Sequence, residues 1–381
     1  MSGIPLPPIT YIDIQPALNT LAETLMQESL IAIDTESNSL HAYRERVCLI
    51  QLSTRTTDYI IDPLVIDDLS PLQPLMASET IEKVFHAAEY DITCMKRDFE
   101  FTFNNLFDTM MAARICGIKM IGLGNMLETY AGVKMDKSHQ RDDWGQRPLP
   151  EESLRYAQMD THFLPYLRDE LYKALDEGDY LHEAQEAFYD VCQTPAAEQR
   201  SFDPDGFWKL GRPKRLRRRE MMILREVYAA REHLAQELNE PPFKIISNNG
   251  LVAIARSRPN NLRELGEVKG IFKTQVRLFG DDILDAVERG KQAKTLPKPP
   301  KHKMPAPDVQ ERYKALRTWR KHRAVRRGVE SDVIVSKQTL WDLAYKAPAT
   351  LADLQEINGL GPWRLQTYAH EILNVLGVEG D

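Results

Sequence analysis

The sequence predicts an α/β domain with a mixed sheet, followed by two all-α helical domains. In residues 1–200, short apolar runs alternate with longer amphipathic runs, which is typical of an α/β sandwich. Residues 201–381 match themselves at a constant offset of 89, which indicates a duplicated helical unit. A chain of 381 residues is also too long for one ordinary core.

The first half begins with strand patterns. Strands are predicted at 30–34 (LIAID), 47–53 (VCLIQLS), 57–62 (TDYIID) and 84–87 (VFHA). The first two are joined by a turn that contains Arg44 and Glu45. These strands come before any long helical pattern, so the sheet is expected to be mixed.

Helical patterns follow the strands. The run DITCMKRDF after residue 90 predicts a helix, and LFDTMMAARICG predicts a strand end that feeds a helix with Asp108 as its N-cap. From about residue 151, PEESLRYAQMDTHFLPYLRDELYKALDEG predicts one long helix that ends at Gly178.

The duplication appears as identities without gaps. The matching pairs are Ser247 and Ser336, Leu251 and Leu340, Ala255 and Ala344, Pro259 and Pro348, Leu262 and Leu351, Leu265 and Leu354, Gly270 and Gly359, Ile283 and Ile372. Between the copies, the proline- and lysine-rich run TLPKPPKHKMPAP favours an extended spacer over a ligand for another domain. The predicted domains are an α/β domain (1–205), a first helical module (212–294), a linker (295–307) and a second helical module (308–381).

Charge is distributed unevenly. Residues 1–200 carry 16 Lys and Arg against 33 Asp and Glu, whereas residues 201–381 carry 33 against 23. An acidic half suits bound cations and a basic half suits a polyanion; two solvated surfaces of opposite sign are the alternative. Four scattered cysteines, no signal-peptide pattern and no apolar run of about 18 residues favour a cytoplasmic protein over a secreted or membrane protein.

Five residues are candidates for chemistry. Asp34 and Glu36 alternate on a strand, about 7 Å apart along the backbone, and such a pair suits a hard divalent cation; an exposed face is the alternative. Asp91 follows a later strand, as a site residue or as an ordinary helix-terminal charge. Tyr156 and Asp160 are four apart and share one face of a helix, although Tyr156 fits a half-buried aromatic equally well.

In chain order, D-x-E on a strand, D after a later strand and Y-x-x-x-D on a helix resemble the tyrosine-bearing branch of the DEDD superfamily of 3′-5′ exonucleases. VFHAAEYDI, LFDTMMAARICG, GLGNMLETYAGVKMDKSHQRDDWGQRPL and LRYAQMD look like ribonuclease D. The duplicated unit is similar to the helicase and RNase D C-terminal (HRDC) domain. The resemblance covers nearly the whole chain and implies a ribonuclease H-like sheet domain with two nucleic-acid-binding modules.

The resemblance implies a two-metal site for Mg²⁺ or Mn²⁺, with the cations about 4 Å apart. Asp34 is then expected to bridge both cations, Glu36 and Asp160 to complete the site that activates water, and Asp91 to support the second cation. Tyr156 is expected to orient the attacking water. Oxygen ligands favour Mg²⁺ or Mn²⁺ over Zn²⁺. Two histidines lie nearby; His86 is expected to be structural and His139 to be an exposed loop residue.

The sequence departs from the family at one position. Many members carry an aromatic residue after Asp-Thr-Glu, where this chain has Ser37. In the family that position packs near the terminal nucleotide, so the departure concerns this contact and not metal binding.

Substrate contacts are predicted in two basic stretches. In the loop at 137–144, Lys137, Ser138, Gln140 and Arg141 are candidates for phosphate contacts and Trp144 for stacking on a base or sugar; a core position for Trp144 is the alternative. The run KLGRPKRLRRRE (209–220), which includes Arg215 and Arg218, has seven cations against one acid and predicts a polyanion surface.

One further motif lies in the second helical module. INGLGPWR (357–364) resembles the hairpin of helix-hairpin-helix elements, whose glycines let backbone amides approach phosphate. The first module has VKGIFKTQ at the same place, without the second glycine. Helix-turn packing is the alternative for both.

These observations favour a ribonuclease D-type 3′-5′ exoribonuclease that trims structured RNA such as tRNA precursors and releases nucleoside monophosphates, with no membrane contact and a monomeric state. Two alternatives remain open: a DNA exonuclease with the same chemistry and an inactive RNA-binding scaffold. A glycosidase could also use paired carboxylates, but the helical repeat and the basic run would then have no purpose.

Overall fold

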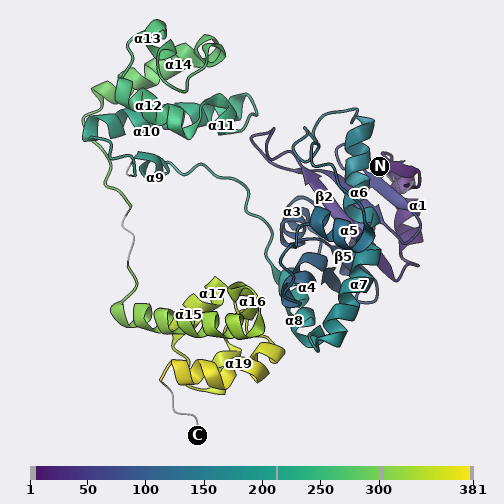
Figure 1. The fold of residues 1–381 in the computed structure, drawn as a ribbon. Helices are drawn as coiled ribbons and strands as arrows, with labels where there is room; N and C mark the ends of the chain where they lie inside the picture. The colour runs from purple at the N-terminus through teal and green to yellow at the C-terminus, as the bar shows by residue number, and fades with distance from the viewer. Residues whose placement is uncertain (1–5, 212, 301–303, 378–381) are drawn as a thin grey trace. The chain divides into compact units, whose positions relative to one another are not determined.

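The structure is a computed structural model that describes residues 6–211, 213–300 and 304–377 (Figure 1). Within these residues the chain forms two compact units. The first contains the described parts of 1–37, 47–197 and 304–381, and the second contains those of 38–46 and 198–303. The second helical module thus shares a compact unit with the sheet domain, by which we mean the described residues of 1–37 and 47–197. The domain boundaries proposed above stay predictions.

The sheet domain is built on one mixed sheet, which has six strands in the described residues, in the order β1-β4-β3-β2-β5-β6. The central strand β2 pairs antiparallel with β3 and parallel with β5. The strands are β1 (Ile9–Ile12), β2 (Leu30–Ser37), β3 (Val47–Ser53), β4 (Asp58–Ile61), β5 (Glu82–Phe85) and β6 (Leu106–Asp108). The predicted mixed sheet is confirmed.

Helices cover the sheet and position the site (Figure 1). They are α1 (Gln15–Leu25), α2 (Gln73–Ala77), α3 (Glu89–Phe99), α4 (Thr109–Ile115), α5 (Leu123–Ala131), α6 (Glu151–His162), α7 (Leu164–Glu177) and α8 (Leu181–Gln193). α6 packs against β2, β3 and β4, and α7 packs against β2 and β5. Two helices therefore meet the central strand directly.

The structure confirms most local predictions and corrects one. Asp108 caps α4, because its side chain accepts hydrogen bonds from the backbone N–H groups of Met110 and Met111. The single helix expected from about 151 to 178 is wrong: it breaks at Phe163 into α6 and α7, since Pro165 has no N–H for the helical ladder and is tolerated only in a first turn. β1 and α1 were not predicted.

The two helical modules repeat the same helices, as the duplication predicts. The first has α10 (Arg218–Glu237), α11 (Pro242–Ile245), α12 (Asn248–Ser257), α13 (Leu262–Gly266) and α14 (Lys273–Gln292), preceded by α9 (Phe207–Gly211). The second has α15 (Pro307–Arg327), α16 (Ser331–Ile334), α17 (Lys337–Lys346), α18 (Leu351–Gln355) and α19 (Pro362–Val375). Ser247 and Ser336 cap equivalent helices, and Gly270 and Gly359 both adopt a positive φ, 88° and 80°, which favours glycine.

The connection between β2 and β3 belongs to the compact unit of the first helical module. The Tyr43 hydroxyl donates to Glu232 and accepts from Gln236, and the Arg200 guanidinium lies 4.9 Å from the centre of the Tyr43 ring. The backbone N–H of Tyr43 donates to the carbonyl of Asn239. Side chains and backbone of this unit thus hold the segment that follows β2.

None of the described helices combines the length and the apolar content needed to cross a membrane.

Candidate active site

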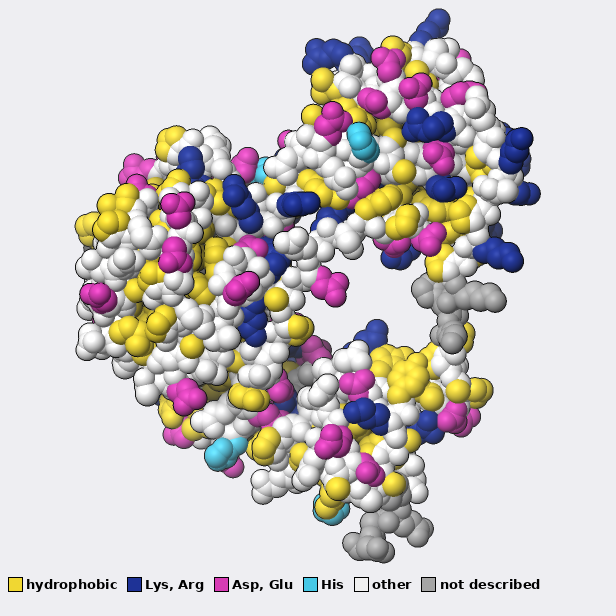
Figure 2. Space-filling view, turned by 180° about the vertical axis from the view of Figure 1, so that it is seen from behind, with side chains coloured by type: hydrophobic (Ala, Val, Ile, Leu, Met, Phe, Trp, Pro, Cys, Tyr) yellow, Lys and Arg dark blue, Asp and Glu magenta, His cyan; other side chains and the backbone are white. Residues whose placement is uncertain are grey.

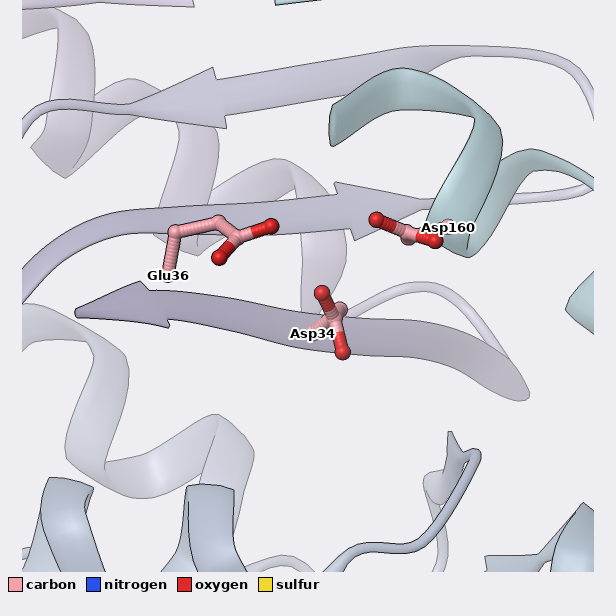
Figure 3. A group of neighbouring side chains, drawn as sticks. All are labelled: Asp34, Glu36 and Asp160. Atoms are coloured by element: carbon pink, nitrogen blue, oxygen red, sulfur yellow. The ribbon is translucent and has the colours of Figure 1, made fainter. Parts of the chain in front are cut away.

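The central strand presents the first two carboxylates. β2 begins as a buried strand, with Ile31 and Ile33 inaccessible to solvent, and ends in polar residues. Asp34 and Glu36 lie on one side of it, because side chains alternate along a strand. Asp160 lies in the last turn of α6, and α6 packs on β2 and β3. The Asp160 carboxylate points toward Asp34 and Glu36 (Figure 3).

Three of the four predicted carboxylates converge. One oxygen from each of Asp34, Glu36 and Asp160 lies within 4.8 Å of the other two. Asp91, in the first turn of α3, is buried outside this trio and accepts a 2.5 Å hydrogen bond from the Thr35 hydroxyl. Its charge acts on Asp34, so it lies close to the trio.

Burial and mutual repulsion raise the pKa of every carboxyl in this group. Burial raises the pKa of Asp34 well above its usual range, and Asp91, Asp160 and Glu36 raise it further. Burial, then Asp160, Asp91 and Asp142, raise the pKa of Glu36 to about 9. Burial also raises the pKa of Asp91 and of Asp160 to about 7. Without a compensating cation, these carboxyls together retain protons at neutral pH, and a bound cation would favour their ionised forms.

The trio fits a divalent cation. Among the described residues, no Lys, Arg or His forms an ion pair with Asp34, Glu36 or Asp160. Asp160 is buried, and Asp34 and Glu36 are half-buried. Carboxylates withdrawn from water without a counter-charge are costly, and clustered oxygen donors are what Mg²⁺ and Mn²⁺ prefer. The arrangement can hold a hard cation and, through it, a phosphate oxygen.

Tyr156 lies on the same helix face as Asp160, as its spacing predicts. The Tyr156 hydroxyl hydrogen-bonds the Asp160 carboxylate. Burial, then the charges of Asp160, Glu36 and Asp34, hold the pKa of Tyr156 far above its usual value. The phenol therefore keeps its proton and acts as a hydrogen-bond donor, not as a base.

The Trp144 ring packs close to the Tyr156 ring. Its ring centre is 6.2 Å from that of Tyr156, and only 1% of the residue is exposed. The prediction that a base or sugar stacks on the Trp144 indole is therefore wrong. Trp144 belongs to the core, as the alternative given above proposes. Arg147 holds the same loop by donating to the Trp144 carbonyl and to Asp62.

Two loop residues near Tyr156 were missed by sequence reasoning. His139, expected to be an exposed residue, pairs its Nδ1 with Asp142 at 2.8 Å, and its ring centre is 6.4 Å from that of Tyr156. Asp142 also accepts from the Ser153 hydroxyl, which ties the loop to α6. His86 is structural as expected: its Nδ1 lies 2.9 Å from the Thr109 hydroxyl.

The other predicted substrate contacts lie at the surface. Lys137, Ser138 and Gln140 are exposed in the loop before α6. Arg215 and Arg218 are exposed on the first helical module, while Arg212 of the same basic run lies outside the described residues. Their contacts with substrate stay predictions.

Tyr90 lies beside Ser37, the position at which this sequence differs from many members of the family it resembles. The Tyr90 hydroxyl lies 3.2 Å from the Ser37 hydroxyl, and Tyr90 is 51% exposed. The first turn of α3 thus places an aromatic ring next to the position where many family members carry one on β2.

Two backbone amides at the end of the hairpin at 357–364 are already bound to a carboxylate. The N–H groups of Trp363 and Arg364, at the start of α19, donate to one oxygen of Glu186 on α8. The Arg364 guanidinium donates to the other oxygen of Glu186 at 2.8 Å. A Cβ on Gly361 would lie 2.4 Å from the Glu186 carboxyl carbon. The packing alternative therefore describes this hairpin.

Comparison with known families agrees with this architecture. A 3′-5′ exonuclease family model matches residues 9–176, and an HRDC domain model matches residues 220–287 and 309–376. Each helical module thus carries one HRDC match.

Individual relatives extend the match along the chain. The ribonuclease D of Gluconacetobacter diazotrophicus is 31% identical over 273 residues, which cover 71% of this chain and 69% of the relative. The crystal structure of Escherichia coli RNase D superposes with a TM-score of 0.66 at 26% identity, covering 98% of this chain and 100% of that one. Exosome complex component 10 of Rattus norvegicus is 32% identical over 247 residues, 63% of this chain.

The match to the larger relatives is partial. The chain spans 28% of the rat exosome component and 18% of Protein RRP6-like 3 of Arabidopsis thaliana.

Proposed function

Because this chain belongs to the ribonuclease D family of 3′-5′ exonucleases, we propose that it is a metal-dependent exoribonuclease that trims structured RNA from the 3′ end. The proposal is carried by the approach of the Asp34, Glu36 and Asp160 oxygens to within 4.8 Å of one another, with no Lys, Arg or His of residues 6–211, 213–300 and 304–377 paired with them. The proposed products are nucleoside 5′-monophosphates: water adds to the phosphorus of the terminal linkage, and the 3′ oxygen of the preceding nucleotide leaves and takes up a proton.

The chain's own residues have distinct tasks in this reaction. Bound Mg²⁺ or Mn²⁺ supplies Lewis-acid chemistry, which lowers the pKa of a coordinated water and neutralises charge on the phosphate. Asp34, Glu36 and Asp160 would hold the cation, and Asp91, which accepts a hydrogen bond from Thr35, would add negative charge beside them. Tyr156 keeps its proton, which it donates to Asp160, and its hydroxyl oxygen would orient the attacking water by accepting a hydrogen bond from it.

Replacement of Tyr156 by phenylalanine is expected to slow RNA hydrolysis by about 10- to 100-fold without abolishing it, as for other partners that orient a metal site. The ring and its packing on Trp144 remain, and only the hydroxyl that donates to Asp160 is lost. Single-turnover rates measured with saturating Mg²⁺ check this expectation, and an unchanged rate would remove the hydroxyl from the mechanism. The KM for RNA should stay near the parent value.

RNA is favoured as the substrate by the basic first helical module and by the relatives. The E. coli enzyme is an exoribonuclease involved in structured RNA processing. We extend this to tRNA precursors as substrates, and to a monomer in the cytoplasm; the four free cysteines fit a reducing compartment.

Digestion of matched RNA and DNA oligonucleotides with 3′ extensions tests the proposal. Stepwise loss of 3′ nucleotides from RNA, dependent on Mg²⁺ or Mn²⁺ and stopped by EDTA, is the expected result. Faster loss of DNA would favour the DNA exonuclease. RNA binding without any nucleotide release under either metal would favour the inactive scaffold.

A further inference from the structure

Three aromatic side chains form a row on the second helical module. The ring of Tyr313 on α15 stacks on Trp341 of α17, with centroids 3.8 Å apart and planes 11° apart. Tyr345 continues the row at 5.8 Å from Trp341, with 56% of the residue exposed. We call Tyr313, Trp341 and Tyr345 the aromatic row. It ends at a ring that is open to solvent.

The module fold does not require this row. At the offset of 89, the first helical module has Leu224, Val252 and Arg256 at these positions. There α9 covers the face, so that Leu224 and Val252 are buried and a Cβ on Gly211 would lie 2.9 Å from Leu224. In the second module the described residues between α14 and α15 form no helix, and the equivalent face carries aromatic rings.

A stripe of cations runs beside the row. Lys314, Arg317 and Lys321 are spaced three and four apart on α15, so they share one helix face, and Arg317 follows Tyr313 by one turn. All three are exposed, and none forms an ion pair within the part of the chain that the structure describes. We call them the cation stripe. Figure 2 shows basic and hydrophobic side chains side by side on this module.

We propose that the aromatic row and the cation stripe form a binding site for single-stranded RNA, in which a base stacks on the row and the neighbouring phosphates meet the stripe. Stacked aromatic faces next to unpaired cations match the alternation of base and phosphate along a strand. A purely apolar protein partner would not need the cations. The inference rests on the proposed function, because it gives the trimmed RNA a second contact outside the carboxylate cluster.

The test measures RNA binding in full-length protein that carries Asp34→Asn to prevent hydrolysis. Anisotropy of a fluorescein-labelled oligoadenylate should show about tenfold weaker binding for Tyr345→Ala, as expected for one lost stacking contact. The combined change Lys314→Gln, Arg317→Gln and Lys321→Gln should lower the slope of log K against log salt by about 2. Because these side chains are exposed, both variants should keep the parent melting temperature.

Tyr189→Ala is the matched control, since Tyr189 is an equally exposed tyrosine (63%) on α8. It should bind RNA like the parent. Parent-like binding by Tyr345→Ala, or an equal loss in Tyr189→Ala, would overturn the site. A change in self-association without a change in RNA binding would assign the row to a protein contact and also overturn it.

A small chromogenic phosphodiester separates this inference from the proposed function. With Asp34 intact, the Tyr345→Ala enzyme should hydrolyse it at the parent rate. If the parent itself hydrolyses neither this substrate nor RNA, the proposed function fails. If the parent is active and Tyr345→Ala binds RNA normally, only the second site fails.

Discussion

Asp34→Asn is expected to reduce RNA trimming by more than about 100-fold, because even residues that only orient metal ligands cost 10- to 100-fold when changed. Asp34 lies at the centre of the cluster: the charges of Asp91, Asp160 and Glu36 all act on it. An amide is nearly isosteric but neutral, so the pocket loses attraction for a divalent cation while the fold is kept. Rates of nucleotide release across a Mg²⁺ titration measure the loss.

RNA binding should be largely intact in this variant, since the basic run and the helical modules are untouched. Asp67→Asn is the matched control, because Asp67 is an exposed carboxylate outside the cluster and should leave the rate unchanged. Parent-like trimming by Asp34→Asn would contradict the metal site. Loss of trimming together with loss of binding would show that the effect is not specific to chemistry.

The raised pKa values of the site carboxyls affect the stability of the metal-free parent protein. The pKa of Glu36, about 9, and those of Asp91 and Asp160, about 7, lie above the values of unfolded carboxyls, which are about 4. Between about pH 4 and pH 9, these carboxyls therefore bind more protons in the folded, metal-free protein than in the unfolded chain. The contribution of these three groups to stability is fully present below about pH 4 and is lost as pH rises toward 9.

We accordingly expect the melting temperature of EDTA-treated protein to fall from pH 5 to pH 9, and Mg²⁺ to reverse part of the fall. Asp34→Asn should flatten the profile, because it removes one of the mutually repelling carboxylates. A steeper profile in the variant than in the parent would contradict this electrostatic description.

Much of the site was predictable because its residues follow local geometry. Asp34 and Glu36 are two apart on a strand, and Tyr156 and Asp160 are four apart on a helix, so each pair shares a face before any tertiary structure is known. The sequence also placed Asp91 just after a strand, near the start of a helix. What joins the pairs is the packing of α6 on β2 and β3, which depends on the strand order.

The parts that sequence reasoning missed depend on contacts between distant segments. Nothing local distinguishes His139 and Asp142 from solvated loop residues, and only the fold of that loop brings His139 beside Tyr156 and Asp142 into contact with His139 and Ser153. The sequence was equally consistent with Trp144 in the core and with Trp144 in contact with substrate, and the burial of its side chain in the structure assigns it to the core. Glu183 and Glu186 on α8 are buried and pair with Arg327 and Arg364 of the second helical module, which are far away in the sequence.

Arg364→Ala is expected to destabilise the packing of the second helical module on the sheet domain by about 3–5 kcal/mol, the cost of breaking a buried ion pair from one side. Arg364 is 7% exposed and donates to Glu186, to Asp190 and to the carbonyl of Ile334. Without it, the buried charge of Glu186 keeps only backbone donors. Hydrogen exchange of α8 and α19, together with thermal unfolding, measures the loss.

A second change separates charge from packing. Glu186→Gln in the Arg364→Ala background should recover part of the stability, because it removes the uncompensated charge. Arg263→Ala should have no effect, since the Arg263 side chain is 90% exposed. Equal exchange in Arg364→Ala and the parent would contradict the role of this pair.

The contact between Arg364 and Glu186 also determines whether the backbone amides at the start of α19 could bind an RNA phosphate. Glu186 occupies the amides of Trp363 and Arg364, which a phosphate would otherwise approach. If Arg364→Ala frees the module, the start of α19 loses its internal carboxylate but also its guanidinium, so RNA affinity should not rise. A strong rise in affinity would mean that the hairpin is a phosphate site held closed by Glu186; unchanged or weaker binding leaves the exposed cations of α15 and of the first module as the electrostatic contacts with RNA.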